Sequence, residues 1–190
     1  YVGAFDPIRK AFAREPLARE RGYTAGTFSF HAGAGRCPAC RGNGFEHVEM
    51  PLLSAVYLRC PTCDGRRYRD AVLEVRLAPA AECDRAPASI AECLDMTVDE
   101  ARGFFADQPD VLRGLEPLAA VGLGYMTLGQ PVPTLSGGEA QRLKLAGHLA
   151  KARRRGGGHK LFLFDEPTTG LHFEDIRVLL TALERLLTVG

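Results

Sequence analysis

Four cysteines in two Cys-x-x-Cys pairs constrain this chain more than any other feature of its sequence. The first pair is Cys37 and Cys40, the second is Cys60 and Cys63, and residues 41–59 separate them. This spacing lies within the range expected for a zinc ion held by four thiolates. Four protein ligands leave no open position on the metal, so we expect one structural zinc ion per chain and no catalytic metal there.

Other uses of the cysteines fit less well. Six cysteines in 190 residues are too few for a secreted disulfide scaffold, and a thioredoxin-like redox motif uses one pair. A chaperone-type zinc module is a closer alternative, because residues 37–44 read C-x-x-C-x-G-x-G. The second pair departs from that pattern at Arg67. The two remaining cysteines, Cys83 and Cys93, are expected to be free thiols.

Composition and charge are those of an ordinary globular chain. Apolar residues make up 46%, charged residues 25%, and the net charge is +1, which argues against disorder and leaves nucleic-acid binding undecided. A length of 190 residues allows one domain with an attached module. No apolar run approaches the ~18 residues of a membrane helix, and no signal peptide opens the chain. We therefore expect a cytoplasmic protein without a membrane partner.

Hydrophobic periodicity and capping signals predict the secondary structure. Helices are expected to begin near Pro7, Thr97, Pro109, Gly137 and Phe173, and short strands to lie at 28–30, 45–50, 56–58, 72–75 and 161–164. The first helix should fade between Pro16 and Gly22, and residues 78–88 read as a loop rich in Ala and Pro.

Residues 135–139 read LSGGE and precede the predicted helix at 137–152. Ser136 and Glu139 fit an N-terminal capping box. That box does not explain two glycines in the first helical turn, where each costs ~1 kcal/mol relative to alanine. Gly137 and Gly138 make sense if a ligand must approach the bare N–H groups, because such a helix start binds phosphate and Ser136 can add a hydroxyl donor.

Basic residues gather in two places. Seven and no acid lie between 141 and 160: Arg142, Lys144, Lys151, Arg153, Arg154, Arg155 and Lys160. Residues 153–160 are either part of a phosphate-binding surface or a solvated basic loop. Residues 36–69 contain six arginines and three acidic residues, a net charge of +3. A zinc ion with four thiolates contributes −2, so the net charge of the module is about +1. These arginines must lie on one face to hold a phosphate backbone; a solvated surface is the alternative.

An apolar run at 161–164 ends in Asp165 and Glu166. A strand covered on both faces would place both acids at the carboxyl end of a sheet, where α/β proteins bind ligands. Asp165 can hold Mg²⁺, and Glu166 can orient or deprotonate a water that attacks a γ-phosphate. Solvated acids at a strand-end turn are the alternative, which the glycine turn upstream makes less favoured.

Taken together, LSGGE at 135–139 and LFLFDE at 161–166 resemble the signature and Walker B motifs of ABC-type ATPases. Thr169, Gly170 and His172 lie where such proteins carry the D-loop. The segments FDPIR, GRC, LDMT, VGLGY and DEPTTGLH, at 5–9, 35–37, 94–97, 121–125 and 165–172, resemble the UvrA family of bacterial excinuclease components. The resemblance covers nearly the whole chain and points to the second ATPase half, and the inserted zinc module is specific to that family among ABC proteins.

The resemblance implies a partial ABC-type (P-loop NTPase-like) ATPase domain of α/β class with an inserted four-cysteine zinc module and a helical signature subdomain. Residues 1–35 would start the signature and insert region, 36–69 would be the zinc module with a hairpin over 44–58, 70–134 a connecting helical subdomain, and 135–190 the signature helix, Walker B strand, D-loop and last helix.

The resemblance also implies a function. Such proteins form homodimers, recognise lesions in double-stranded DNA with the help of ATP and Mg²⁺, and load the next protein of nucleotide excision repair. Asp165 and Glu166 would be catalytic toward this half's own ATP. The signature residues would contact ATP bound by another unit: Ser136, Gly137, Gly138, Glu139 and Gln141. The DNA-binding residues would be the arginines of the zinc module: Arg36, Arg41, Arg59, Arg66 and Arg67.

Departures from the family pattern bear on these expectations. The Walker A pattern G-x-x-x-x-G-K-[ST] is absent, so we expect it before Tyr1, the switch histidine beyond Gly190, and no ATPase activity of this chain alone. Residues 31–35 lack an expected lysine, and 78–88 look like a small insertion. These changes leave open a UvrA-like paralogue of the drug-resistance branch. A zinc-dependent DNA-binding module with vestigial ATPase parts is a further alternative.

Overall fold

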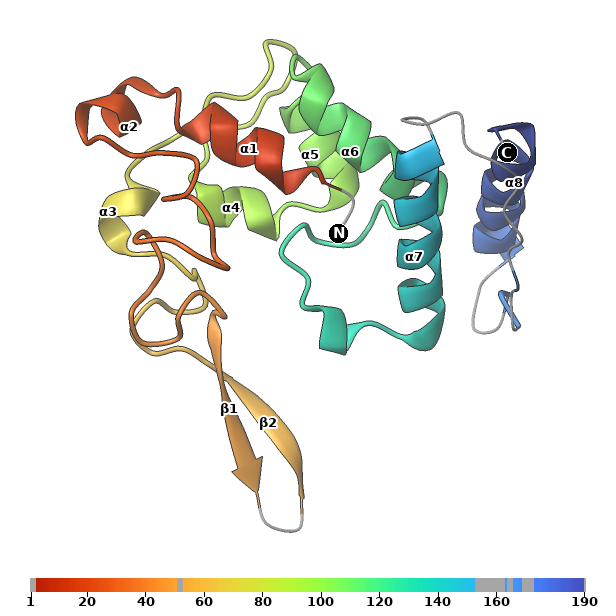
Figure 1. The fold of residues 1–190 in the computed structure, drawn as a ribbon, viewed down its shortest axis with the longest axis horizontal. Helices are drawn as coiled ribbons and strands as arrows, with labels where there is room; N and C mark the ends of the chain where they lie inside the picture. The colour runs from red at the N-terminus through yellow and green to blue at the C-terminus, as the bar shows by residue number, and fades with distance from the viewer. Residues whose placement is uncertain (1–2, 51–52, 153–162, 164–165, 169–172, 190) are drawn as a thin grey trace. The chain divides into compact units, whose positions relative to one another are not determined.

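The computed structural model describes residues 3–50, 53–152, 163, 166–168 and 173–189 (Figure 1). They form helices and one two-stranded sheet, and the chain divides into two compact units. We call Asp6–Pro79 with Asp84–Cys93 the cysteine unit. The other unit, Tyr1–Phe5, Ala80–Cys83 and Leu94–Gly190, is the helical unit.

The cysteine unit is built from short helices and a hairpin around an aromatic core. Its elements are most of α1 (Phe5–Phe12), α2 (Pro16–Glu20), β1 (Phe45–Met50), β2 (Leu53–Arg59), α3 (Asp70–Leu73) and most of α4 (Ile90–Asp95). The rings of Phe12 and Phe28 pack with centroids 5.4 Å apart, and the Tyr68 hydroxyl donates to the Phe28 carbonyl at 2.9 Å. These three side chains are buried, so they tie α1 to the loops that carry the cysteines.

The sheet is a single antiparallel hairpin. Phe45 lies opposite Arg59 and Val48 opposite Val56, and the register shifts between Val48 and Met50, as at a β-bulge. Figure 1 shows the hairpin extending outward from the loops at its base. Both strands therefore emerge from the part of the chain that holds the four cysteines.

The helical unit packs three helices around α6. It contains α5 (Val98–Phe104), α6 (Pro109–Ala120), the 3₁₀ helix η1 (Val132–Thr134), α7 (Gly137–Ala152) and α8 (Phe173–Val189). Contacts join α6 to α5, α7 and α8. The buried side chains at its centre are large and apolar: Phe104, Phe105, Val111, Leu115 and Leu123.

Helix starts were the most predictable elements. Thr97 and Glu100 form the expected capping box, α6 begins at Pro109, and α7 and α8 begin at Gly137 and Phe173. The hairpin strands lie where 45–50 and 56–58 were predicted, and 78–88 hold no helix or strand beyond a single bridge at Ala88. The predicted strand at 161–164 lies outside the described residues, except Leu163.

Three short predictions were wrong. Residues 28–30 are not a strand, because Phe28 ends a pair of tight turns with its ring buried against Phe12. The apolar run at 72–75 overlaps the helix α3 instead of forming a strand. The first helix, expected to fade between Pro16 and Gly22, ends at Phe12, and a second helix, α2, follows with Pro16 in its first turn. Short apolar runs do not distinguish a strand from one buried helical turn. Within the described ranges, no helix has both the length and the apolar content that crossing a membrane requires.

Gly114 and Gly103 provide a test of this packing. A Cβ at Gly114 would lie 2.6 Å from the Cα of Ala4, whereas one at Gly103 would meet nothing within 4 Å. We expect Gly114→Ala to lower the free energy of unfolding by about 1–3 kcal/mol through overpacking. Gly103→Ala should raise it by about 0.5–1 kcal/mol, because helical alanine is favoured over glycine. Urea unfolding of the two variants measures both effects, and equal midpoints would contradict this packing.

Candidate functional site

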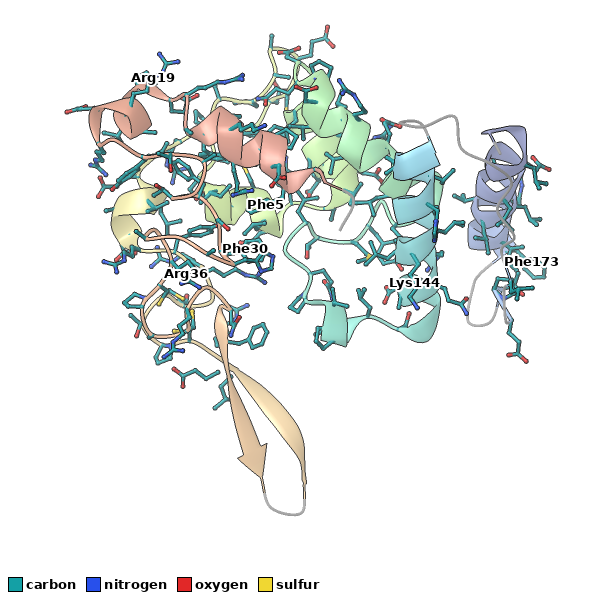
Figure 2. The ribbon with its side chains drawn as sticks, viewed as in Figure 1. Phe5, Arg19, Phe30, Arg36, Lys144 and Phe173 are labelled. Carbon is teal, nitrogen blue, oxygen red and sulfur yellow. The ribbon has the colours of Figure 1, made fainter. Side chains whose placement is uncertain are left out.

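The four cysteine sulfurs converge on one buried point. All four Sγ atoms lie within 4.8 Å of one another, with Cys37 to Cys60 at 4.0 Å and Cys40 to Cys63 at 3.7 Å. A tetrahedral zinc ion with Zn–S bonds of ~2.3 Å separates its sulfurs by about 3.8 Å. Figure 2 shows sulfur atoms gathered in the loops at the base of the hairpin, near Arg36. The donor set and its spacing therefore fit one structural zinc ion.

The two cysteine pairs lie on loops with the same backbone course. Positive φ occurs at the first, second and fourth residue after each second cysteine: Arg41, Gly42 and Gly44 in one loop, Asp64, Gly65 and Arg67 in the other. The Cys37 N–H donates to the Arg67 carbonyl at 2.9 Å, and the Cys60 N–H donates to the Gly44 carbonyl at 3.0 Å. Each loop is thus closed by the other.

Arg67 departs from the sequence pattern of the first loop without changing its backbone. Its φ is 70°, close to the 81° of Gly44. The strain of a non-glycine residue in this region is accompanied by a side-chain contact, because the Arg67 guanidinium lies 5.0 Å from the centroid of the Phe30 ring. Arg67 therefore differs from the C-x-x-C-x-G-x-G pattern in residue type, while the backbone of the second loop follows that of the first.

Hydrogen bonds within the loops favour a thiolate at Cys60, whereas burial disfavours one at Cys63. Burial raises the pKa of Cys60, but the backbone N–H groups of Cys63 and Thr62 outweigh it and lower that pKa to about 7. Burial raises the pKa of Cys63 to about 12. The Gly44 N–H donates to the Cys40 sulfur at 3.3 Å. Since zinc binds the deprotonated thiol, N–H groups directed at sulfur prepare the cluster for the metal.

Two of the arginines predicted to bind DNA interact with neighbouring residues of the loops. Arg36 donates to the carbonyls of His31 at 2.9 Å and Gly33 at 3.1 Å. Arg66 forms an ion pair with Asp70 at 3.1 Å. Their charges are held by local acceptors, as is the guanidinium of Arg67 over its aromatic ring.

Arg41 and Arg59 differ from these three. Both are exposed, and in the described part of the chain neither guanidinium has a hydrogen bond or ion pair. Arg59 is the last residue of β2 and directly precedes Cys60. The structure therefore divides the five predicted arginines into three that hold the loops and two whose guanidinium groups are open to a ligand.

The glycine turn is capped as its sequence predicts. The Ser136 N–H donates to the Glu139 carboxylate at 2.8 Å, and the Glu139 N–H donates to the Ser136 hydroxyl at 3.2 Å. Gly137 has no positive φ, and a Cβ there would meet nothing within 4 Å. Neither the backbone nor the packing of the described residues therefore requires glycine at this exposed position.

Sequence reasoning missed two further residues of this region, Tyr125 and Arg142. The Tyr125 hydroxyl donates to Glu139 Oε1 at 2.8 Å and accepts from Arg142 Nη2 at 3.3 Å. The Ser136 N–H and then the Tyr125 hydroxyl lower the pKa of Glu139, so this carboxyl is ionised. In the sequence Arg142 is one of a run of basic residues. Its burial is therefore not apparent from the sequence.

The structure describes only some of the remaining predicted residues. Gln141 is half-buried in α7, and Lys144 is exposed on the same helix (Figure 2). Glu166 is exposed and takes a left-handed φ of 43°, which is uncommon for glutamate. Asp165, residues 153–160 and the D-loop residues Thr169, Gly170 and His172 lie outside the described residues.

Comparison with known proteins gives one consistent family. UvrABC system protein A from Thermus thermophilus is 50% identical over all 190 residues of the chain, which cover 19% of that protein. The protein of the same name from Methanothermobacter thermautotrophicus is 52% identical, with the same coverage of both chains. The crystal structure of UvrA2 from Deinococcus radiodurans matches with a TM-score of 0.86 at 48% identity, over 100% of this chain and 21% of that one.

The chain spans about a fifth of the length of the curated relatives it matches. No family model matches it.

Metal analysis tests the cysteine cluster. We expect about one zinc ion per chain in protein purified under reducing conditions without chelator, and loss of that zinc with partial unfolding in Cys60→Ser, because metal binding supplies folding free energy. Cys83→Ser is the matched control, since Cys83 is half-exposed and lies outside the cluster. Zinc retained in Cys60→Ser, or absent from the unaltered chain, would contradict the assignment.

Proposed function

This chain is homologous along its whole length to one region of UvrABC system protein A, and we propose that it is part of an ATP-dependent DNA-damage recognition protein of nucleotide excision repair. The region is the second ATPase half of that protein, with residues 36–69 as an inserted zinc module. The full-length protein acts as a homodimer in the cytoplasm and loads the next repair protein onto damaged double-stranded DNA.

The observation that carries the nucleotide part of the proposal is the exposed Gly137. Glycine in a first helical turn costs ~1 kcal/mol relative to alanine, and no contact in the described residues offsets that cost. A phosphate group at the helix start offsets it, because it receives bare N–H groups and the positive end of the helix dipole. Ser136, Gly137 and Gly138 therefore contact ATP held by another unit, with Glu139 and Gln141 beside them.

Glu166 supports the hydrolytic part. A left-handed φ on a non-glycine residue costs about 1–3 kcal/mol, and residues with such backbone strain cluster at active sites. Glu166 is the residue that orients or deprotonates the attacking water, and Asp165 holds Mg²⁺ on the same ATP. This ATP is a different molecule from the one that Ser136 contacts. In one ABC unit, the Walker B acids act on the ATP bound by that unit, and the signature turn contacts the ATP bound by another unit.

The hairpin and the two available arginines support the DNA part. A two-stranded hairpin is marginally stable alone, and here the zinc site holds the start of β1 and the end of β2 at the base of the hairpin. Arg59 at the end of β2 and Arg41 in the first loop present guanidinium groups that phosphate oxygens accept. The hairpin thus meets the duplex near a lesion, with these arginines on the backbone.

A resistance paralogue is the second candidate. It is favoured by residues 31–35, which read HAGAG and carry no lysine. Expression of the full-length protein in a repair-deficient bacterium separates the two functions. Rescue of survival after ultraviolet light favours excision repair, whereas tolerance of a DNA-binding drug without that rescue favours the paralogue.

The nucleotide assignment predicts the effect of a charge at the signature turn. In the full-length protein, Ser136→Arg should reduce ATP turnover at least tenfold, because the side chain blocks the helix start and removes a hydroxyl donor. Zinc content should not change. Ala81→Arg adds the same side chain at an exposed loop position and should keep full turnover. Wild-type turnover in Ser136→Arg would contradict the assignment.

The two classes of arginine predict different DNA-binding behaviour. Arg59→Ala should weaken binding of the full-length protein to any duplex and lower the salt slope by about 0.9, because one phosphate contact is lost. Arg66→Ala removes a guanidinium that is paired with Asp70 and should leave that slope unchanged. Equal slopes for Arg59→Ala and the unaltered protein, measured by titrations at several salt concentrations, would exclude Arg59 from the interface.

A further inference from the structure

Tyr125 connects the signature turn to a buried cation. Its hydroxyl donates to Glu139 Oε1 at 2.8 Å, and the same oxygen accepts from Arg142 Nη2 at 3.3 Å. Glu139 uses its other oxygen to accept from the Ser136 N–H at 2.8 Å. One tyrosine hydroxyl thus lies between the capping carboxylate of α7 and a guanidinium one turn further along the same helix.

The loop that carries Tyr125 is fixed on the helical unit. Gly122 takes a φ of 74°, and a Cβ there would lie 3.5 Å from Arg142 Nη1. A Cβ at Gly124 would lie 2.2 Å from the Asp99 carboxylate, and the Asp99 N–H donates to the Gly124 carbonyl at 3.0 Å. The Val98 N–H also donates to the Met126 carbonyl at 2.8 Å, so backbone hydrogen bonds on both sides of Tyr125 fix its position.

Arg142 depends on this tyrosine. Only 5% of Arg142 is exposed, and its Nε and Nη1 atoms have no hydrogen-bond partner among the described residues. A buried charge with few acceptors is costly, so removal of one acceptor has a large effect on where the guanidinium lies. The Tyr125 oxygen is such an acceptor.

Glu139 places a negative charge at a helix start that is proposed to bind phosphate, and its capping role alone does not explain this. A carboxylate in the first turn of a helix stabilises the helix but repels a phosphate that approaches the same N–H groups. The Tyr125 hydroxyl and the nearby Arg142 charge both stabilise the ionised Glu139, which lowers its pKa. They therefore hold the carboxylate in its cap and offset its charge where an anion must bind.

We propose that Tyr125 is a positioning residue for ATP hydrolysis, which links Glu139 to Arg142 through its hydroxyl so that the amides of Gly137 and Gly138 stay open to the nucleotide phosphate. This inference rests on the proposed function. It assigns Tyr125 no contact with ATP. Its effect passes through Glu139, and that route distinguishes it from a residue that only stabilises the fold.

The test uses Tyr125→Phe in the full-length protein, assayed for ATP turnover without DNA. Tyr125 is 54% exposed, so loss of the hydroxyl leaves no internal cavity. We expect kcat to fall roughly three- to tenfold, the effect of one lost hydrogen bond to a charged group, with KM for ATP within about twofold. Tyr23→Phe removes a tyrosine hydroxyl from the cysteine unit and should keep the wild-type kcat.

A double-mutant cycle with Glu139→Ala tests the route. If Tyr125 acts through Glu139, adding Tyr125→Phe to Glu139→Ala should change kcat by less than about twofold. Fully multiplicative losses would overturn the inference, as would an unchanged kcat in Tyr125→Phe when the wild type is active. Absence of turnover in the wild type would overturn the proposed function as well, so the two failures are distinguishable.

Discussion

The convergence of four thiolates on one point is the constraint on which the hairpin depends. Gly44 directly precedes β1 and Cys60 directly follows β2, and the Cys60 N–H donates to the Gly44 carbonyl. The two ends of the hairpin are therefore held by the same loops that hold the sulfurs. A two-stranded hairpin is marginally stable in water, so the base closed by the two cysteine loops supplies the order that a hydrophobic core supplies in larger sheets.

Glycines in the helical unit fall into two classes that the structure separates. Gly114 lies where a Cβ would collide with the backbone of Ala4, so packing within the chain explains it. Gly137 has open space and an ordinary φ, so nothing within the described residues explains it. The same residue type thus reports packing at Gly114, whereas at Gly137 the proposed nucleotide contact is the explanation that we offer. Steric neighbours, which the sequence does not show, distinguish these cases.

Features governed by local spacing were predictable from the sequence. Each Cys-x-x-Cys pair depends on residues a few positions apart. The same holds for the capping boxes at Thr97 and Ser136 and for the start of α6. The strand expected at 28–30 failed because burial of Phe28 against Phe12 is a tertiary effect. The roles of the arginines and the link from Tyr125 to Arg142 were missed for the same reason, since each depends on which distant atoms accept the hydrogen bonds.

The reciprocal closure of the two cysteine loops has a consequence for the order of events during synthesis. The backbone of Cys37 is held by the carbonyl of Arg67, and that of Cys60 by the carbonyl of Gly44. Neither half can reach its final course while the other is missing. As the chain leaves the ribosome, the first cysteine pair therefore lacks its backbone partner until residue 67 has emerged.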